Sequence, residues 1–91
     1  MAHKHESHPG IILRLKRAQG HMASVLTMLE DGRSCVELAQ QLHAIEGAVR
    51  NAKRELIHDH IEHCLVDDGQ GHGHASGGTA LSELKQLSKY L

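Results

Sequence analysis

The sequence contains no Phe, no Trp and a single Tyr, at position 90. Aromatic side chains usually supply a large share of the apolar area that a small core buries. A chain of 91 residues has room for one domain, and such a domain buries only about 60–65% of the surface of its unfolded chain. We therefore expect a weak core in each chain and association with further copies through apolar helix faces.

A large excess of charge of one sign is also absent, since 10 Lys and Arg residues stand against 11 Asp and Glu residues. Overall charge therefore does not predict nucleic-acid binding, and only a local cluster of basic residues could provide it. No apolar run approaches the ~20 residues that span a bilayer, and the polar, His-rich N-terminus does not resemble a signal peptide. We expect a cytoplasmic protein without a membrane partner.

Histidine, in contrast, is abundant, with 10 residues, and the chain has two cysteines. In a chain expected to be cytoplasmic, two cysteines favour a metal or redox pair over a structural disulfide. The stretch "HDHIEHC" at residues 58–64 gathers three imidazoles, two carboxylates and a thiol within about two helical turns. This composition predicts a metal site.

Apolar residues that recur at steps of four and three predict two long helices. The first is predicted over residues 9–30, with Pro9 in its first turn and Gly32 as its C-cap. The second is predicted over residues 34–65 and begins with the capping-box pattern of Ser34 and Glu37. The two apolar seams are Ile11, Leu15, Ala18, Met22, Val25 and Leu29, and Leu38, Leu42, Ile45, Val49, Ala52 and Leu56.

The remaining segments are a polar arm, a linker and a short helix. Residues 1–8 form the arm, and residues 67–78 have the Gly- and His-rich composition of a flexible linker. Residues 79–91 return to a helical pattern that begins at Thr79. The predicted fold class is therefore all-α, with two long helices and a short C-terminal helix in a single domain over residues 1–91.

A metal site needs more than one segment of this chain. His60 and Cys64 are four residues apart and share one helix face, but zinc or copper needs at least a third ligand. Cys35 is the obvious candidate, yet it lies roughly 38 Å from His60 along the same predicted helix. The two positions can meet only when two such helices pack antiparallel, so the sequence predicts an intersubunit site that occurs twice in a dimer.

Cys35 also lies in the first turn of its helix, a position that favours the thiolate. A thiolate binds metals and reacts with electrophiles, so sensing of formaldehyde or a persulfide through Cys35 is an alternative function. Each cysteine taken singly could instead be a small core residue. The spacing of His60 and Cys64, combined with the seam, favours the metal site.

Three segments, "RLKRAQGH", "CVELAQQLHAIEGAV" and "LIHDHIEHC", together resemble the CsoR/RcnR family of bacterial repressors. The family pattern runs Arg-x-x-Arg-x-x-Gly-Gln, then Cys, then Gln-Gln-x-x-Ala-x-x-Gly-Ala, then His-x-x-x-Cys or His, and the resemblance covers roughly residues 9–65. It implies dimers of antiparallel helices that pair into tetramers and bind operator DNA without a helix-turn-helix. An inducer at the cysteine site would release the DNA.

The resemblance also implies a ligand set. Cys35, His60 and Cys64 match the Cys, His, Cys ligands of copper sensors, and His3 matches the N-terminal ligand of nickel and cobalt sensors. The combined set implies Ni(II) or Cu(I) as the inducer, with Co(II) or Zn(II) as further candidates. Other histidines that could complete the site, or bind metal separately, are His5, His8, His63, His72 and His74.

For DNA binding, the resemblance implies Arg14 and Arg17, with Lys16 between them. His21 departs from the family pattern, which has Gln there, and Ser34 stands where copper sensors often carry Tyr. The sequence thus predicts a metal-responsive transcriptional repressor, and a metal-storage or chaperone module without a DNA role is a second alternative. Neither an enzyme nor a small-molecule substrate is expected, because nothing resembles a catalytic arrangement.

Overall fold

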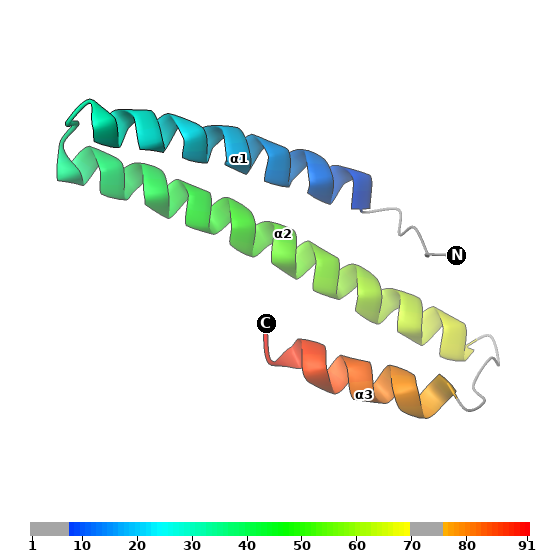
Figure 1. Cartoon of the computed structure of the whole chain (residues 1–91). Coiled ribbons are helices and arrows are strands. Elements are labelled where there is room, and N and C mark those ends of the chain that lie inside the picture. The colour runs from blue at the N-terminus through cyan, green and yellow to red at the C-terminus, as the bar shows by residue number, and fades with distance from the viewer. Residues whose placement is uncertain (1–7, 70–75) are drawn as a thin grey trace.

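The computed structural model describes residues 8–69 and 76–91, with side chains described for residues 8–63 and 81–91 (Figure 1). The described residues form three helices, α1 (His8–Glu30), α2 (Cys35–Gly69) and α3 (Ser76–Ser88). Helices α1 and α2 form an antiparallel hairpin, and α3 folds back along the C-terminal part of α2 (Figure 1). The prediction of an all-α fold with two long helices and a short C-terminal helix is confirmed.

The turn between α1 and α2 is built as the sequence predicts. Gly32 has a φ of +74°, which is the left-handed conformation that only glycine adopts without strain. The N–H of Gly32 donates to the carbonyl of Leu29 at 3.1 Å, and the N–H of Arg33 donates to the carbonyl of Met28 at 3.0 Å. These two bonds satisfy carbonyls at the end of α1 and constitute a Schellman motif.

The start of α2 realises half of the predicted capping box. The backbone N–H of Glu37 donates to Ser34 Oγ at 3.1 Å, so Ser34 is the N-cap. The Glu37 carboxylate accepts hydrogen bonds from the Arg33 guanidinium, with 3.0 Å from Nε to Oε1 and a second bond from Nη2 to Oε2. The guanidinium is the stronger donor because it is charged, so Glu37 turns towards Arg33.

The helix bounds differ from the sequence prediction mainly around the predicted linker. Helix α2 continues to Gly69, and α3 begins at Ser76 where Thr79 was expected. Helix α3 therefore starts three residues before the predicted start, within the segment predicted as a linker. After Ser88 the backbone forms hydrogen bonds between residues three apart, including one from the Tyr90 N–H to the Leu87 carbonyl at 2.9 Å. Such bonds are common at helix ends.

The two predicted seams each divide into two halves. Every second member is buried, with 2–9% of its surface exposed, and these residues pack α1 against α2. The members between them remain 42–54% exposed, because a step of four residues turns the side chain about 40° around the helix. We name the buried set the inner half (Ile11, Ala18, Val25, Leu38, Ile45 and Ala52) and the exposed set the outer half (Leu15, Met22, Leu29, Leu42, Val49 and Leu56).

The hairpin is long and thin, and its interior is small. The structure measures 58 × 24 × 16 Å, and its buried cluster at the turn end consists of Val25, Leu38 and Ile45, with Met28 packed against them. Ile57, 2% exposed, is buried farther along α2. None of the helices in the described part of the chain has both the length and the apolarity to cross a membrane.

Candidate metal centre and nucleic-acid interface

The predicted ligands Cys35 and His60 lie on a single uninterrupted helix. Cys35 is the first residue of α2, and His60 comes 25 positions later in the same helix. At 1.5 Å per residue this separation is roughly 38 Å, so one chain cannot bring both side chains to one ion. Within residues 8–63 and 81–91, no three His, Cys, Asp or Glu side chains gather closely enough to hold a metal.

Cys35 is accessible for binding an external group. It is a free cysteine with an exposed side chain, and the cap at Ser34 fixes the backbone directly before it. The N–H groups of the first helical turn point away from the helix body, where they favour negative charge on a nearby ligand. The Cys35 side chain is therefore exposed at the start of α2, beside the turn of the hairpin.

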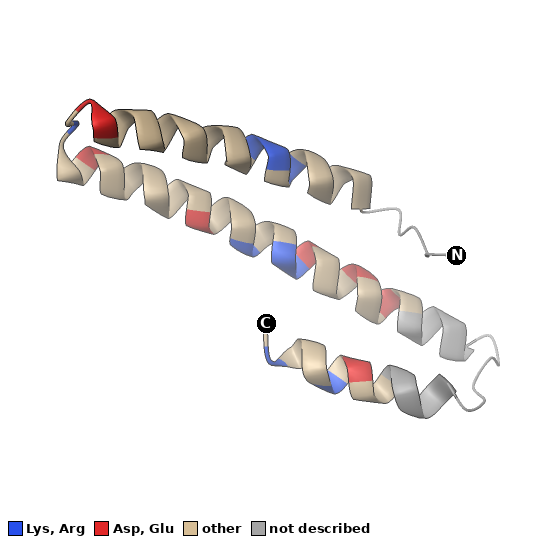
Figure 2. Ribbon diagram, in the orientation of Figure 1, with Lys and Arg blue, Asp and Glu red and all other residues tan. Residues whose placement is uncertain are grey.

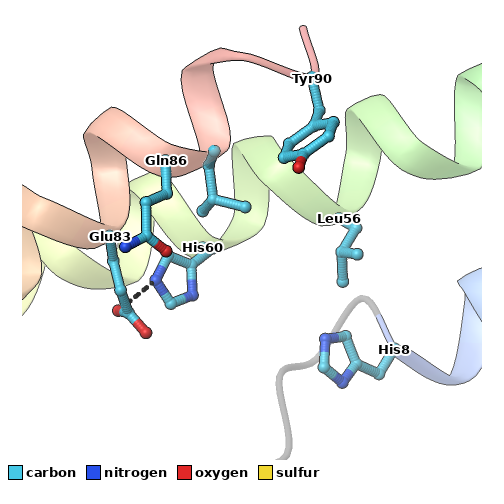
Figure 3. A pocket seen from close by; sticks show the side chains of 7 residues that line it. His8, Leu56, His60, Glu83, Gln86 and Tyr90 are labelled. Carbon is cyan, nitrogen blue, oxygen red and sulfur yellow. Dashed lines mark hydrogen bonds and ion pairs between the residues drawn. The ribbon is translucent and has the colours of Figure 1, made fainter.

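His60 lies at the opposite end of the hairpin, where all three helices meet. Its side chain is 29% exposed, and Nε2 lies 3.0 Å from Glu83 Oε1 on α3. Figure 3 shows both side chains at the edge of a pocket of about 320 Å³ that is also lined by Leu56, Leu87, Gln86, Tyr90 and His8. A carboxylate on one nitrogen of an imidazole fixes the ring orientation and makes the other nitrogen a better metal ligand.

Only some of the other candidate ligands lie within the described residues. Cys64 lies one helical turn after His60 on α2, but its side chain, like His3, His5, His72 and His74, lies outside the described residues. His8, the first described residue of α1, lines the same pocket as His60. His63 Nδ1 lies 3.8 Å from Asp59 Oδ1 and 3.3 Å from the Asp59 carbonyl oxygen.

Glu83 is a residue that sequence reasoning missed. It is one of several polar residues on a short helix, and its spacing from His60 crosses the predicted linker. Only the return of α3 along α2 brings the carboxylate to the imidazole (Figure 3). No periodicity in the sequence carries this information, because it depends on how α3 packs against α2.

The predicted DNA-contacting residues lie on α1 and are exposed. They share the hairpin with three exposed basic residues of α2, and Figure 2 shows the Lys and Arg positions of both helices along the same stretch of the hairpin. Arg14 Nη1 donates to Glu55 Oε1 on α2 at 2.6 Å. The basic residues concerned are Arg14, Lys16 and Arg17 on α1, and Arg50, Lys53 and Arg54 on α2.

Two hollows flank the contact between α1 and α2 and share Ala18. The basic hollow, of about 370 Å³, is lined by Arg14, Arg17, His21 and Asn51, together with Ala18 and Ala48. His21, which lines this hollow, donates from Nε2 to Gln41 Oε1 at 2.5 Å. The apolar hollow, of about 450 Å³, is lined mainly by Ile12 and by the outer-half residues Leu15, Met22 and Val49. An exposed apolar surface of this kind usually marks an interface.

Comparisons with known proteins agree with this architecture. The sequence profile of the family described as "Metal-sensitive transcriptional repressor" matches residues 7–90. The copper-sensing transcriptional repressor CsoR of Bacillus subtilis (strain 168) is 34% identical over 76 residues, which are 84% of this chain and 72% of that protein. CsoR of Mycobacterium ulcerans (strain Agy99) is 39% identical over 61 residues, which are 64% of this chain and 52% of that protein.

A solved structure extends the similarity to the whole fold. The nickel-responsive transcriptional regulator InrS superposes with a TM-score of 0.78 at 29% sequence identity, and the match covers 100% of both chains. The similar proteins thus include sensors named for copper and a regulator named for nickel. None of the matched proteins named here is an enzyme, as the sequence predicts for this chain.

Proposed function

The chain belongs to the family of metal-sensitive transcriptional repressors, and we propose that it binds operator DNA in its metal-free form and releases it when Ni(II) or Cu(I) binds between two chains. The observation that carries this proposal is the placement of Cys35 and His60 at distant positions of one continuous helix. Each is an incomplete site in its own chain. Antiparallel pairing of two α2 helices completes both sites at once.

The outer half supports such pairing. Its six apolar residues are 42–54% exposed. Three of them lie on each long helix, and each follows an inner-half residue by four positions. Burial of apolar surface at about 25 cal/mol per Å² is the main driving force for association. We expect a dimer, or a tetramer built from two dimers, as the functional form in the cytoplasm.

The donor set fits the proposed metals. Two thiolates, from Cys35 and Cys64, and the imidazole of His60 suit Cu(I), and a further imidazole from His3 gives a four-coordinate set that suits Ni(II). His3 is five residues upstream of His8, a reach of up to about 17 Å for extended chain. Since His8 lines the pocket beside His60, the arm is close enough to supply this ligand.

Release of DNA requires that the bound ion favour one arrangement of the chains over another. A bound ion would link Cys35 of one chain to His60 and Cys64 of another and so fix the two α2 helices relative to each other. Arg14, Lys16 and Arg17 lie on α1 helices packed against them, so their spacing along DNA changes with that arrangement. A coupling of ~1–3 kcal/mol would weaken DNA binding ~5–150-fold.

The deciding experiment compares Cys35→Ala with the wild type. A labelled duplex is first selected by the metal-free wild-type protein from a randomised library, and its affinity is then measured by fluorescence anisotropy during titration with Cu(I) or Ni(II). We expect Cys35→Ala to bind the duplex normally without metal and to stay bound when metal is added. Release of the variant at the same metal concentration as the wild type would show that Cys35 is not part of the sensor.

Replacement of His3 separates the two metals. His3→Ala leaves both thiolates and His60 in place, so we expect the response to Ni(II) to weaken more than the response to Cu(I), which needs no fourth ligand. His5→Ala is the matched control, since it removes an imidazole from the same arm. Equal loss of both responses in His3→Ala would contradict a role restricted to nickel.

Sensing of an electrophile is the second candidate, and the exposure of Cys35 at the start of α2 favours it. Formaldehyde or a persulfide donor replaces the metal in the same anisotropy assay. Release of the metal-free protein by either compound, without release by Cu(I) or Ni(II), would support this candidate. A storage module without a DNA role would instead be indicated if Arg17→Ala left the DNA affinity unchanged.

A further inference from the structure

Arg14 is the one predicted DNA-contacting residue that is bound to a carboxylate in the described part of the chain. Its Nη1 donates to Glu55 Oε1 at 2.6 Å, across 41 positions of sequence and between two helices. The Arg14 and Glu55 side chains are 52% and 37% exposed, so this ion pair lies at the surface. Arg17, one turn later on α1, forms no ion pair with any side chain that the structure describes.

The basic hollow beside this pair has the donors that an anion needs. Its lining includes Arg14 and Arg17, whose guanidinium groups are donors, and Asn51, whose amide can donate as well as accept. These groups come from both helices of the hairpin and surround about 370 Å³. A carboxylate and a phosphate diester present similar oxygen acceptors to a guanidinium, so each can replace the other as the partner of an arginine.

We propose that the basic hollow binds one backbone phosphate of the DNA and so serves as a phosphate seat. Without DNA, the Glu55 carboxylate is the partner of Arg14, and the phosphate displaces this carboxylate when DNA binds. This proposal rests on the DNA-binding function proposed above and goes beyond it, because it assigns a phosphate seat and a competing residue to this chain. Glu55 is then a positioning residue. It holds the Arg14 side chain at the edge of the hollow and lowers the affinity for DNA.

The competition has a defined physical origin. Binding of the phosphate breaks an ion pair between two partly exposed side chains, which is worth little in water. The displaced Glu55 carboxylate then stays close to a phosphate of the same charge, which is unfavourable and is strongest at low salt. Both effects oppose DNA binding, so removal of the Glu55 charge should strengthen it.

Glu55→Gln tests this proposal, with Glu37→Gln as the matched control. Glu37 is also on α2 and also pairs with an arginine, Arg33, and its side chain is 35% exposed against 37% for Glu55. It lies 18 positions, or about 27 Å, from Glu55 along the helix, which is well beyond the screening length of about 10 Å at 0.1 M salt. Both variants remove one negative charge per chain, but only Glu55→Gln frees an arginine of the hollow.

The measurement is the affinity of the metal-free protein for the duplex selected by the wild type, at two salt concentrations. We expect Glu55→Gln to bind about three- to tenfold more tightly at low salt, with a smaller gain at high salt. Glu37→Gln should change the affinity less than about twofold. In an Arg14→Ala background the gain from Glu55→Gln should shrink, because only the repulsion between the Glu55 carboxylate and the phosphate is left to remove. An equal gain in both backgrounds, or from both glutamate variants, would overturn the proposal in favour of bulk charge.

The phosphate seat itself is tested by Asn51→Ala and Arg17→Ala. Loss of the neutral Asn51 amide should weaken binding without changing its salt dependence, whereas loss of Arg17 should weaken binding and make the salt dependence shallower. An unchanged affinity for DNA in Asn51→Ala would contradict the proposed phosphate seat but not the DNA-binding function. An unchanged affinity in Arg17→Ala would contradict the role of Arg17 in the hollow, whereas a failure of the wild type to select any duplex would contradict the DNA-binding function itself.

Discussion

The inner and outer halves of the helix seams have nearly the same sequence pattern and opposite environments. Both consist of apolar residues repeated every seven positions on α1 and α2, but the inner half is 2–9% exposed and the outer half is 42–54% exposed. The residues of the inner half pack α1 against α2 within the hairpin. The outer half is left at the surface, where it is available to a second copy of the chain.

This difference shows how a chain without an aromatic core is organised. The inner half alone provides a thin interior that includes two alanines, Ala18 and Ala52. The outer half carries only the larger side chains of Leu, Met and Val and leaves them exposed. In the assembly proposed above, these larger side chains would be buried between chains, so we expect the stability to depend on protein concentration.

The largest effect is expected from truncation of the inner half. Ile45 is 4% exposed and packs with Val25 and Leu38, so Ile45→Ala should lower the free energy of unfolding by about 2–4 kcal/mol. Urea unfolding followed by circular dichroism at several protein concentrations measures this loss. The loss should be similar at all concentrations, whereas Leu42→Ala in the outer half should depend on concentration. If the loss of unfolding free energy depended on protein concentration in the same way in both variants, the inner and outer halves would not have different roles.

The next effect is expected on assembly. Val49 is 43% exposed in the outer half, and Val49→Asp would place a carboxylate in the proposed interface, where burial of an unpartnered charge is costly. We expect the dissociation constant of the dimer to rise at least about 100-fold, measured by sedimentation equilibrium. Gln40→Asp, at an exposed position of the same helix, is the control and should leave association unchanged. A wild-type chain that is monomeric and folded at micromolar concentration would also contradict this interface.

A smaller effect is expected at the turn that sets the register of the two halves. Gly32 has a φ of +74°, so Gly32→Ala should cost about 1–2 kcal/mol of stability. Gly20 is a glycine in the interior of α1 whose added Cβ would meet no atom within 4 Å. Gly20→Ala should therefore stabilise the chain by roughly 0.5–1 kcal/mol. Thermal unfolding of both variants measures whether Gly32→Ala lowers the stability and Gly20→Ala raises it. Stabilisation by Gly32→Ala would be inconsistent with the observed turn.

The smallest effect is expected from the surface ion pair at the start of α2. Glu37 and Arg33 form an exposed pair four residues apart, and such pairs contribute about 0.3–0.5 kcal/mol. Glu37→Gln should therefore shift the urea midpoint only slightly, while Ser34→Ala, which removes the N-cap, should cost about 0.5–2 kcal/mol. A larger loss in Glu37→Gln than in Ser34→Ala would reverse this order.

The candidate site was predictable from the sequence to the extent that it depends on residues within one helix. The spacing of His60 and Cys64 and the position of Cys35 at the start of α2 are set by helical geometry and by the Ser34 cap. Contacts between helices were not predictable in the same way. The Glu83 bond to His60 and the Glu55 bond to Arg14 join positions 23 and 41 residues apart, and no local pattern specifies them.

The sequence by itself determined the helices, the turn at Gly32 and the apolar seams, because helix periodicity, capping and backbone conformation are local properties of the chain. It also determined that Cys35 and His60 cannot meet within one chain, because a helix has a fixed rise per residue. Only the tertiary structure decided which half of each seam is buried, because that depends on the rotation of α1 relative to α2. For the same reason it alone placed Glu55 on Arg14 and folded α3 back so that Glu83 reaches His60.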